Sequence, residues 1–401
     1  MHDRLVWKFG GTSVGDTHRL RAVARRLVDA QRRGLQVVAV LSAMGDTTDD
    51  LVRLAYEMSP QPQPRELDAL LALGECQSCA LAALVVHAMG GRAVSLSGAQ
   101  AGMLTDASHG NARLREVNPQ RVVEALDDGA IVLVTGFQGV SHAGDITTLG
   151  RGGSDATAIA LAAALGVGRC DIFTDVTGVF TADPRIVPNA RQIRALTFEE
   201  MLELAEAGAR VLQLRAVELA AAHGIEIHVR STFSAERGTL IVRKDNQMFE
   251  ETRVAGIAHR GYDPVYTVKH LSLATVSSAL ARRGTGVGAI IREGERVRFT
   301  APGAGRADVL AALAVLGADA DVQDDLGSVT VVSSAFGSRP ELTASILAAL
   351  EDSGIESHLV TSTASRVSCH VAAPVVDRAA RVLHELFELG VDTAPALSLA
   401  S

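Results

Sequence analysis

Hydrophobic residues gather in short continuous runs along the first 243 residues, separated by longer runs that have a polar face or many alanines. The short runs are typical of buried strands and lie at Leu5–Phe9, Leu35–Leu41, Ile131–Val134, Asp171–Thr174 and Glu226–Val229. The longer runs predict helices up to about Arg33, over Leu67–Met89 and Ser154–Leu165, and from Thr197 to about Ala207. Alternation of this kind is typical of a mostly parallel sheet covered on both faces. The pattern therefore predicts an α/β fold in which helices sandwich the sheet.

The pattern changes after Val242, where the polar segment Arg243–Gln247 predicts a linker. Two stretches about 65 residues apart then repeat the order strand, helix, strand pair, helix. Their strands are expected at Val265–His270, Val287–Ile291, Arg296–Thr300, Val329–Ser333, Ile355–Thr361 and Arg366–Ala372, and their helices at Leu271–Arg283, Ala307–Leu316, Glu341–Asp352 and Val376–Leu389. Such ferredoxin-like βαββαβ modules form binding platforms more often than catalytic sites. We expect a catalytic domain at residues 1–245 and modules at 246–321 and 322–401, with pairing of strand 253–258 into the second module as an alternative.

Composition and charge narrow the possible partners. Aromatic residues make up 3% of the chain, and the formal net charge is −8. An acidic chain does not favour binding to nucleic acid or to an anionic membrane, and no stretch approaches the roughly 20 apolar residues of a membrane span. The four cysteines include Cys76-x-x-Cys79 in a helical run, without a second pair to complete a metal site. We expect a cytoplasmic protein with no nucleic-acid partner, no membrane partner and no metal-ligating residues.

Glycine-rich turns follow several of the predicted strands. They are Lys8–Ser13, Ser42–Asp46, Gly136–Gly139 and Gly150–Asp155. In an open parallel sheet, ligands bind at the carboxyl ends of the strands, and glycines and helix N-termini let backbone N–H groups approach an anion. The chain has no P-loop motif, and no dinucleotide motif follows its first strand. The turns together therefore predict a phosphate site of another kind.

Three charged side chains lie on these turns and a fourth lies in a predicted helix, and each has a plainer interpretation. Lys8 is placed to neutralise a transferred phosphoryl group, or is a surface lysine. Arg151 offers two parallel hydrogen bonds to a carboxylate, or forms a surface ion pair. Asp155 binds substrate, or caps its helix. Glu75 lies in an apolar helical run, where it needs a polar partner such as a substrate amine, unless that helix face is exposed.

Taken together, these segments resemble the aspartate kinases of the amino-acid kinase family. The resemblance covers essentially the whole chain, and its order and spacing make it specific. It is carried by WKFGGTSVGD (7–16), VLSAMGDTTDDL (40–51), LALGE (71–75), SLSGAQAGMLTDASHGNAR (95–113), VTGFQGV (134–140), TTLGRGGSDATAIALAAALG (147–166), FTDVTGVFTADPRIVPNA (173–190) and FEEMLELAEAGARVLQLRAVELA (198–220). The C-terminal part resembles the paired ACT modules of that family, which bind lysine or threonine and restrain the kinase.

The resemblance implies ATP-dependent phosphorylation of the L-aspartate side-chain carboxylate to 4-phospho-L-aspartate, with Mg2+, as the first step of aspartate-derived amino-acid synthesis. It implies that Lys8 and Asp155 are catalytic. Substrate would contact Ser42, Thr47, Glu75, Phe137, Arg151, Gly153 and Ser154, and the nucleotide would contact Gly10, Gly11, Ser13, Thr174, Asp175, Phe180, Arg185 and Arg210. It also implies a homo-oligomer that forms through the ACT-like modules.

Several positions depart from the family pattern. Arg210 replaces a lysine that is expected to reach the nucleotide phosphates, and Phe180 replaces a tyrosine. The first module lacks the Asp-x-Pro-Gly turn that helps to hold the effector, and the second has Pro340-Glu341 in place of Pro-Gly. We therefore expect weak sensitivity or insensitivity to lysine and threonine, which would suit supply of a specialised pathway. Two alternatives stay open: a kinase of a related amino-acid carboxylate, or a non-catalytic amino-acid-sensing regulator.

Overall fold

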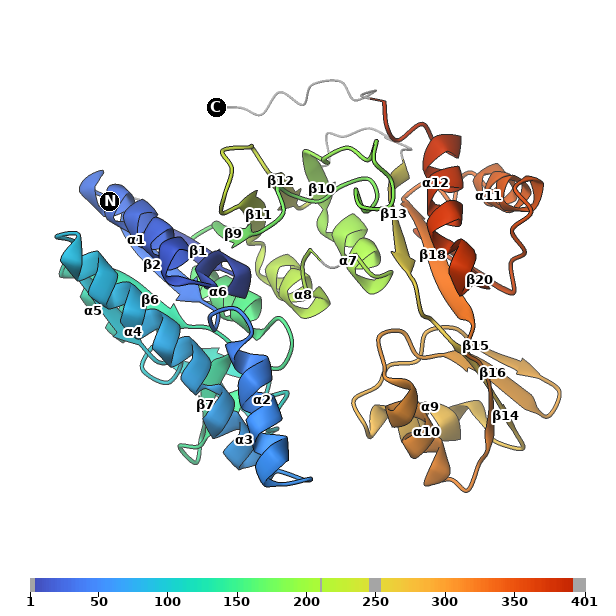
Figure 1. Cartoon of the computed structure of the whole chain (residues 1–401), viewed down its shortest axis with the longest axis horizontal. Helices are drawn as coiled ribbons and strands as arrows, with labels where there is room; N and C mark the ends of the chain where they lie inside the picture. Colours follow the sequence, from blue (N-terminus) through green and yellow to red (C-terminus); the bar gives the residue numbers. More distant parts are fainter. Residues whose placement is uncertain (1–3, 210, 245–253, 392–401) are drawn as a thin grey trace. The chain divides into compact units, whose positions relative to one another are not determined.

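The computed structural model describes residues 4–209, 211–244 and 254–391 (Figure 1). These residues form two compact units, which we describe separately. The first unit contains residues 4–179, 192–198 and 211–244, and the second contains residues 180–191, 199–209 and 254–391. The predicted boundary at residue 245, most of the predicted linker and Arg210 lie outside the described residues.

An eight-stranded sheet forms the centre of the first unit, in the order β10-β12-β11-β9-β1-β2-β6-β3. Its strands are β1 (Arg4–Phe9), β2 (Gln36–Leu41), β3 (Ala93–Leu96), β6 (Ile131–Thr135), β9 (Arg169–Thr174), β10 (Ala195–Thr197), β11 (Glu226–Ser231) and β12 (Thr239–Val242). Neighbouring strands run parallel except β11 and β12. The mostly parallel sheet expected from the apolar runs is confirmed.

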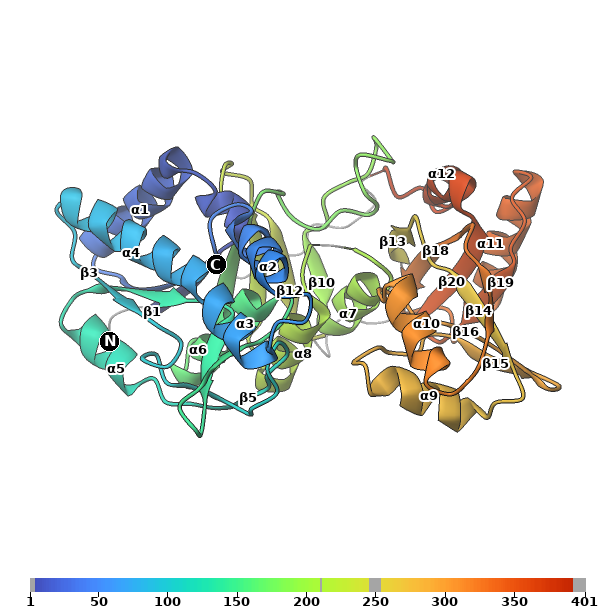
Figure 2. The ribbon, with the colours of Figure 1, turned by 60° about the horizontal axis from the view of Figure 1, so that its bottom comes forward.

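Helices cover both faces of this sheet (Figure 2). On one face lie α1 (Thr17–Arg32) and α4 (Leu73–Ala88), and on the other lie α5 (Gln120–Asp127) and α6 (Gly153–Ala164). Helix α8 (Leu214–His223) packs against α6. Trp7 and Phe9 of β1 belong to the core beneath α1 and α4. Because side chains alternate along a strand, Lys8 between them points to the opposite face, where α6 begins.

A small four-stranded sheet, not predicted from the sequence, extends the first unit. Its order is β5-β4-β7-β8, with β4 (Met103–Thr105), β5 (Leu114–Val117), β7 (Gln138–Ser141) and β8 (Ile146–Thr148). Helix α2 (Thr47–Met58) contacts α3 (Pro64–Leu71), and α3 in turn contacts β8. Strands of three or four residues are too short to show a period in the sequence.

The long helix expected at Leu67–Met89 is broken at Ala72 into α3 and α4. Gln138 of β7 donates a hydrogen bond from Nε2 to the carbonyl oxygen of Ala72 (2.9 Å) at this break.

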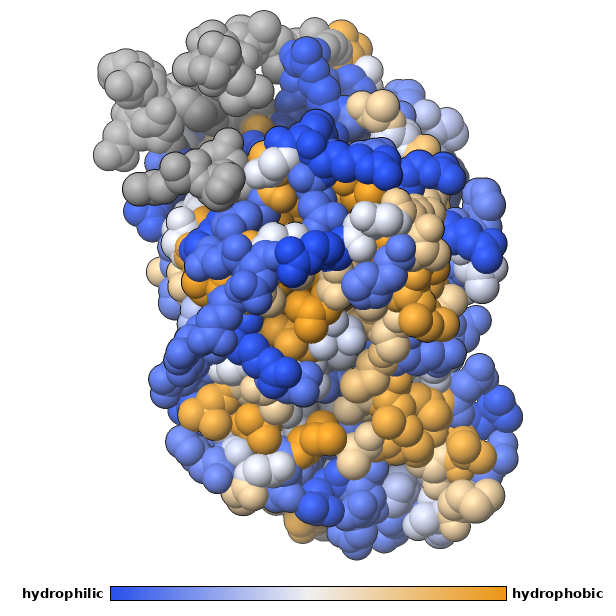
Figure 3. Space-filling view, turned by 90° about the vertical axis from the view of Figure 1, so that its left-hand side faces the viewer, coloured by the Kyte–Doolittle hydropathy of each residue, from blue (hydrophilic) through white to orange (hydrophobic). Residues whose placement is uncertain are grey.

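By length and composition, the stretch Pro64–Ala88 could cross a membrane, but half of its most apolar window is buried, as in a core helix. The face shown in Figure 3 carries both hydrophilic and hydrophobic residues.

The second unit contains two antiparallel sheets with ferredoxin-like order. One has the order β15-β16-β14-β17, formed by β14 (Val265–Lys269), β15 (Ile290–Glu293), β16 (Arg296–Thr300) and β17 (Ala320–Gln323), with helices α9 (Leu273–Ala281) and α10 (Arg306–Ala314). The other has the order β13-β18-β20-β19, formed by β13 (Val254–Arg260), β18 (Leu326–Ser333), β19 (Leu359–Ser362) and β20 (Arg366–Ala372), with α11 (Glu341–Asp352) and α12 (Val376–Leu386). Strand β13 therefore supplies the outer strand of the sheet formed later in the chain, while β14 to β17 form a sheet of their own.

Two earlier segments of the chain belong to the same unit. Thr181 contacts His384 of α12 through Oγ1 and Nε2 (3.0 Å), and its carbonyl oxygen accepts a hydrogen bond from the Ile257 N–H (2.8 Å). Helix α7 (Phe198–Glu206) is linked to β20 because Arg366 pairs with Glu203 (3.0 Å) and Glu206 (2.6 Å). Residues 180–191 and 199–209 are thus built onto the module that contains α12.

Candidate active site

Lys8 and Asp155 form an ion pair at the carboxyl end of β1. Lys8 Nζ lies 2.7 Å from Asp155 Oδ1, and both side chains are largely buried. Asp155 lies in the first turn of α6, where the helix dipole favours a carboxylate. The fold therefore brings together the two residues predicted to be catalytic, although they lie far apart in the sequence.

The turn after β1 lies against the turn after β2. The Gly45 N–H donates to the Gly11 carbonyl oxygen (3.2 Å), and a Cβ on Gly11 would lie only 3.0 Å from the Ala43 carbonyl oxygen. The Ser42 N–H donates to the Phe9 carbonyl oxygen (3.1 Å). These bonds place the turns carrying Lys8 and Ser42 side by side, as the parallel arrangement of β1 and β2 requires.

Glu75 is buried beside the same turn. Its Oε1 accepts a hydrogen bond from the Ala43 N–H (3.1 Å), whereas its buried Oε2 has no hydrogen-bond partner among the described residues. Burial raises the pKa of Glu75 to about 7, and the bond from Ala43 opposes that shift. The exposed-face interpretation of Glu75 is therefore wrong, because the residue is 3% exposed. A cationic ligand would satisfy the unpartnered oxygen.

The turn after β6 packs closely against the start of α6. A Cβ on Gly136 would lie 2.5 Å from Ser154 Oγ, and one on Gly153 would lie 3.0 Å from the Phe137 ring. Phe137 itself has φ 70°, a left-handed conformation that is unusual for an aromatic residue. This turn and the helix start therefore hold Phe137, Gly153 and Ser154 together, and Asp155 follows directly.

Two further predicted substrate residues, Thr47 and Arg151, lie at the start of α2 and in the loop before α6. Thr47 begins α2, and its Oγ1 donates to the Met44 carbonyl oxygen (2.6 Å). Arg151 is exposed and lies between Gly150 and Gly152, which have φ values of 74° and 72°. These left-handed positions suit glycine and shape the loop that leads into α6.

The predicted nucleotide residues are divided between the units. Gly10, Gly11, Ser13, Thr174 and Asp175 belong to the first unit, and Phe180 and Arg185 belong to the second. Ser13 is fully buried, and its Oγ lies 2.6 Å from Thr232 Oγ1. Thr174 donates from Oγ1 to Asp175 Oδ1 (3.0 Å).

Arg185 forms an ion pair with Asp183. Its Nη2 lies 2.6 Å from Asp183 Oδ2, and its Nε donates to Oδ1 (3.0 Å). These bonds hold the pKa of Asp183 below its usual value. The pair shapes the loop of the second unit that carries both Phe180 and Arg185.

Three polar residues beside these turns were missed by the sequence reasoning: Asp68, Arg215 and Thr232. Arg215 donates to the carbonyl oxygens of Leu149 (2.6 Å) and Ala112 (2.7 Å), and Asp68 is buried beside β8. A carboxylate in the run ELDALLALGE is the one signal that could have drawn attention to Asp68, since a buried carboxylate needs partners.

Comparisons with known proteins agree with this architecture. Residues 3–231 match the amino acid kinase family. The aspartokinase of Geobacillus stearothermophilus is 45% identical over 97% of this chain and 98% of its own, and that of Mycolicibacterium smegmatis is 43% identical over 97% of each. The solved structure of E. coli aspartokinase III with aspartate and ADP shares the fold, with a TM-score of 0.82, 24% identity and coverage of 96% of this chain and all of that one. The chain therefore belongs to the amino acid kinase family and, within it, to the aspartokinases.

Proposed function

We propose that this chain transfers the γ-phosphoryl group of ATP to the side-chain carboxylate of L-aspartate and forms 4-phospho-L-aspartate and ADP. The observation that carries the proposal is the grouping of the Lys8–Asp155 pair with the buried, unpartnered oxygen of Glu75, around turns that end parallel strands. The near full-length likeness to aspartokinases supports the choice of substrate.

In this proposal the two charged groups on the α-carbon of aspartate are each held by side chains of opposite charge. Glu75 and Asp155 bind the α-ammonium group, and Arg151 binds the α-carboxylate. An ammonium group against Glu75 Oε2 gives that buried carboxylate the partner it lacks, and so favours its charged form. The side-chain carboxylate of the substrate is already ionised near pH 7, so no protein base is needed.

The transfer step then depends on positioning and on charge. A carboxylate oxygen attacks the γ-phosphorus while the bond from that phosphorus to the β,γ-bridging oxygen breaks, and ADP leaves with the bond's electron pair. Lys8 neutralises charge on the moving phosphoryl group. We propose that Gly10, Gly11, Ser13, Ser42, Thr47, Phe137, Gly153 and Ser154 shape the phosphate and substrate sites, and that Thr174, Asp175, Phe180, Arg185 and Arg210 hold the nucleotide.

Mg2+ fits this site as an ion carried by the nucleotide. The described part of the chain has no group of three or more His, Cys, Asp or Glu side chains that could hold a metal. Mg2+ commonly keeps several waters and binds through substrate phosphates with one or two carboxylates. Asp175, exposed at the end of β9, is such a carboxylate, and the ion would supply positive charge that offsets the charge of the phosphates.

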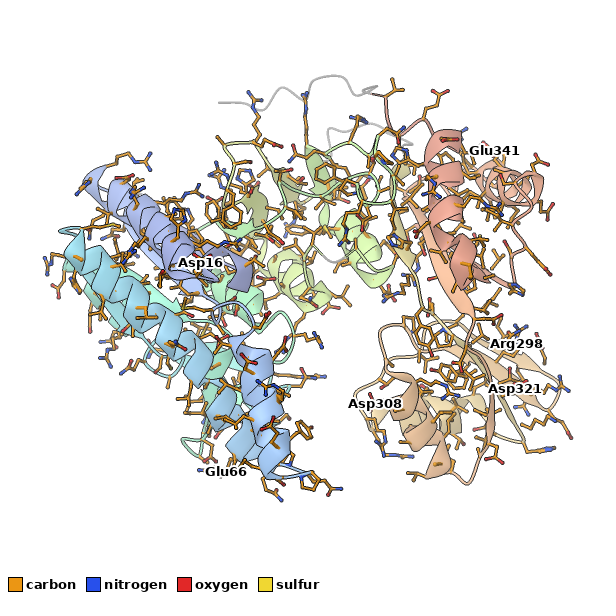
Figure 4. All side chains as sticks on the ribbon, viewed as in Figure 1. Asp16, Glu66, Arg298, Asp308, Asp321 and Glu341 are labelled. Atoms are coloured by element: carbon orange, nitrogen blue, oxygen red, sulfur yellow. The ribbon has the colours of Figure 1, made fainter. Side chains whose placement is uncertain are left out.

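We also propose weak feedback by lysine and threonine. The turn that links β14 and α9 contains no glycine, and His270 in it has φ 57° and lies near Glu295 (3.5 Å). At the start of α11, Glu341 pairs with Arg339 (2.9 Å), so this helix start already carries a carboxylate (Figure 4). An effector carboxylate would have to compete with it. Calorimetry should show no tight binding of lysine or threonine; tight binding together with inhibition would contradict the proposal.

The remaining proposals concern organisation. We propose a catalytic domain over residues 1–245 followed by ACT-like modules at 246–321 and 322–401, with β13 paired into the second. A homo-oligomer formed through these modules and a cytoplasmic location complete the proposal.

A coupled assay of ADP release tests the activity and Lys8 together. Lys8→Ala should abolish aspartate-dependent turnover while the fold persists. The matched control is Lys269→Ala, which removes an exposed lysine of β14 and should leave turnover unchanged. Turnover that survives in Lys8→Ala would refute the role of Lys8, and turnover only with another amino acid would refute the choice of aspartate.

A further inference from the structure

Asp68 of α3 is a buried carboxylate that the proposed reaction does not use. It is 1% exposed, whereas Glu66 on the same helix is exposed (Figure 4). His109 Nδ1 lies 2.8 Å from Oδ2, and the Gly110 N–H lies 3.0 Å from each carboxylate oxygen. Thr148 donates from its N–H (3.1 Å) and from Oγ1 (2.5 Å). Both oxygens of Asp68 are therefore satisfied within the protein.

These bonds fix the loop that carries Arg151. Thr148 ends β8 and directly precedes Leu149, whose N–H donates to the Phe137 carbonyl oxygen (2.8 Å). The turn at His109–Asn111 lies against the same loop, because a Cβ on Gly150 would lie 3.2 Å from the Gly110 carbonyl oxygen. Asp68 thus binds both the strand end and the turn that flank this loop.

Asp68 also lies on the helix pair that carries Glu75. Helix α3 leads through Ala72 into α4, and Glu75 lies in the first turn of α4. The bond from Gln138 to Ala72 joins that break to β7, which pairs with β8. Asp68 therefore cross-links the helix pair that carries Glu75 to the loop holding Arg151.

We propose that Asp68 is a positioning residue, which sets the distance between the groups that bind the α-ammonium and the α-carboxylate of the substrate. This inference rests on the proposed function, since it takes Glu75 and Arg151 as those groups. Asp68 does not touch substrate, and its effect passes through the Thr148 and Gly110 backbone. Loss of its bonds should therefore weaken aspartate binding and spare ATP binding.

The structure provides a matched control in the Arg65–Asp145 pair. Arg65 of α3 lies 2.8 Å from Asp145, which directly precedes β8. This exposed pair joins the same two elements, but at the end of β8 away from Arg151. Asp145→Asn should therefore leave catalysis unchanged.

Steady-state kinetics of Asp68→Asn, Thr148→Val and Asp145→Asn test the proposal. We expect the KM for aspartate to rise about tenfold or more in Asp68→Asn and by about threefold in Thr148→Val, with the KM for ATP unchanged. In a double-mutant cycle, adding Asp68→Asn to Arg151→Gln should raise that KM by much less than Asp68→Asn does alone. The proposal would be overturned if the KM for aspartate were unchanged in both Asp68→Asn and Thr148→Val. It would also be overturned if the KM values for aspartate and ATP rose equally, or if the effects of Asp68→Asn and Arg151→Gln on the KM for aspartate were additive. If Asp68→Asn does not fold, Thr148→Val, which keeps the backbone donor, decides.

Hydrogen exchange separates this proposal from the proposed function. Amides of residues 149–153 should exchange faster in Asp68→Asn than in the wild type or in Asp145→Asn. If the wild-type protein turns over no aspartate, the proposed function fails, and exchange alone tests the positioning role. Equal exchange in all three proteins would overturn it.

Discussion

At the scale of the residue, the site depends on a few side chains whose surroundings are set by distant parts of the chain. Lys8, Arg151 and the glycine turns could be predicted from the sequence, because strand ends and glycines mark phosphate sites. The need of Glu75 for a polar partner could also be predicted, but its bond from the Ala43 N–H could not, because Ala43 is 32 residues away. Asp68 was missed for the same reason, since its partners lie 41 to 80 residues away.

Glu75 should make aspartate binding depend on pH. Burial raises its pKa to about 7, so free enzyme holds Glu75 increasingly protonated as pH falls from 8 to 6. Neither the ammonium nor the carboxylates of aspartate titrate there, so the KM for aspartate should rise toward pH 6, and Glu75→Gln should show a high KM at both pH values. A wild-type KM that is equal at pH 6 and pH 8 would contradict this account.

The raised pKa of Glu75 should also change the free energy of unfolding. A carboxyl group with a raised folded pKa destabilises the free protein as pH rises from about 4.5 to 7. Glu75→Gln should therefore be more stable than the wild type at pH 8, by up to about 3 kcal/mol, and this advantage should shrink toward pH 5. Denaturant melts without ligand at both pH values measure the difference, and a variant less stable at pH 8 would count against it.

Gly136 should not tolerate a side chain. A Cβ there would lie 2.5 Å from Ser154 Oγ and 2.9 Å from Ser154 Cα, so the start of α6 would have to move. Gly136→Ala should lower kcat/KM by about 100-fold, because Asp155 follows Ser154. Gly168→Ala, where nothing lies within 4 Å, is the matched control and should keep normal activity. Normal kinetics of Gly136→Ala would show that this close packing does not position the site.

At the scale of the element, the apolar runs predicted five strands of the large sheet and most helices of both halves, but not the short strands β3, β10 and β12. The break at Ala72 could not be predicted, because alanine favours a helix and the nearest glycine, Gly74, lies inside α4. The pairing of β13 with β18 joins strands that are about 70 residues apart, and it remained an alternative because local pattern says nothing of such a partner. Residues 180–191 read as an extension of the first domain, yet Thr181 contacts His384 of α12.

His384 should make the second unit less stable in mild acid. Burial lowers its pKa from 6.5, and nearby Arg191 lowers it further, so the unfolded chain binds the proton better. Stability that is present near pH 7 should therefore fall as pH drops below about 6.5. Thermal melts between pH 5 and pH 7 should show a weaker pH dependence in His384→Gln than in the wild type. The control His223→Gln removes an exposed histidine, and its pH dependence should equal that of the wild type. If His384→Gln also shows the wild-type pH dependence, the role of His384 is refuted.

At the scale of the whole molecule, the chain forms a sandwiched parallel sheet and two ferredoxin-like sheets, as the change in pattern after Val242 predicts. The sequence places the end of the catalytic domain near residue 245, whereas residues 180–191 and 199–209 belong to the second unit. The segment 180–191, which carries Phe180 and Arg185, is therefore built onto the module that contains α12, through Thr181. The sequence alone could not show that these segments belong to the second unit, because their assignment depends on contacts between residues far apart in the chain.

Trapping of the product with hydroxylamine tests the central claim most directly. Acyl phosphates react with hydroxylamine, so protein, ATP, Mg2+ and L-aspartate should yield aspartyl hydroxamate in amounts equal to the ADP formed. Omission of aspartate, or replacement of Lys8 by alanine, should remove both products. ADP without hydroxamate, or no ADP from folded wild-type protein supplied with aspartate, would contradict the assignment of this chain as an aspartate kinase.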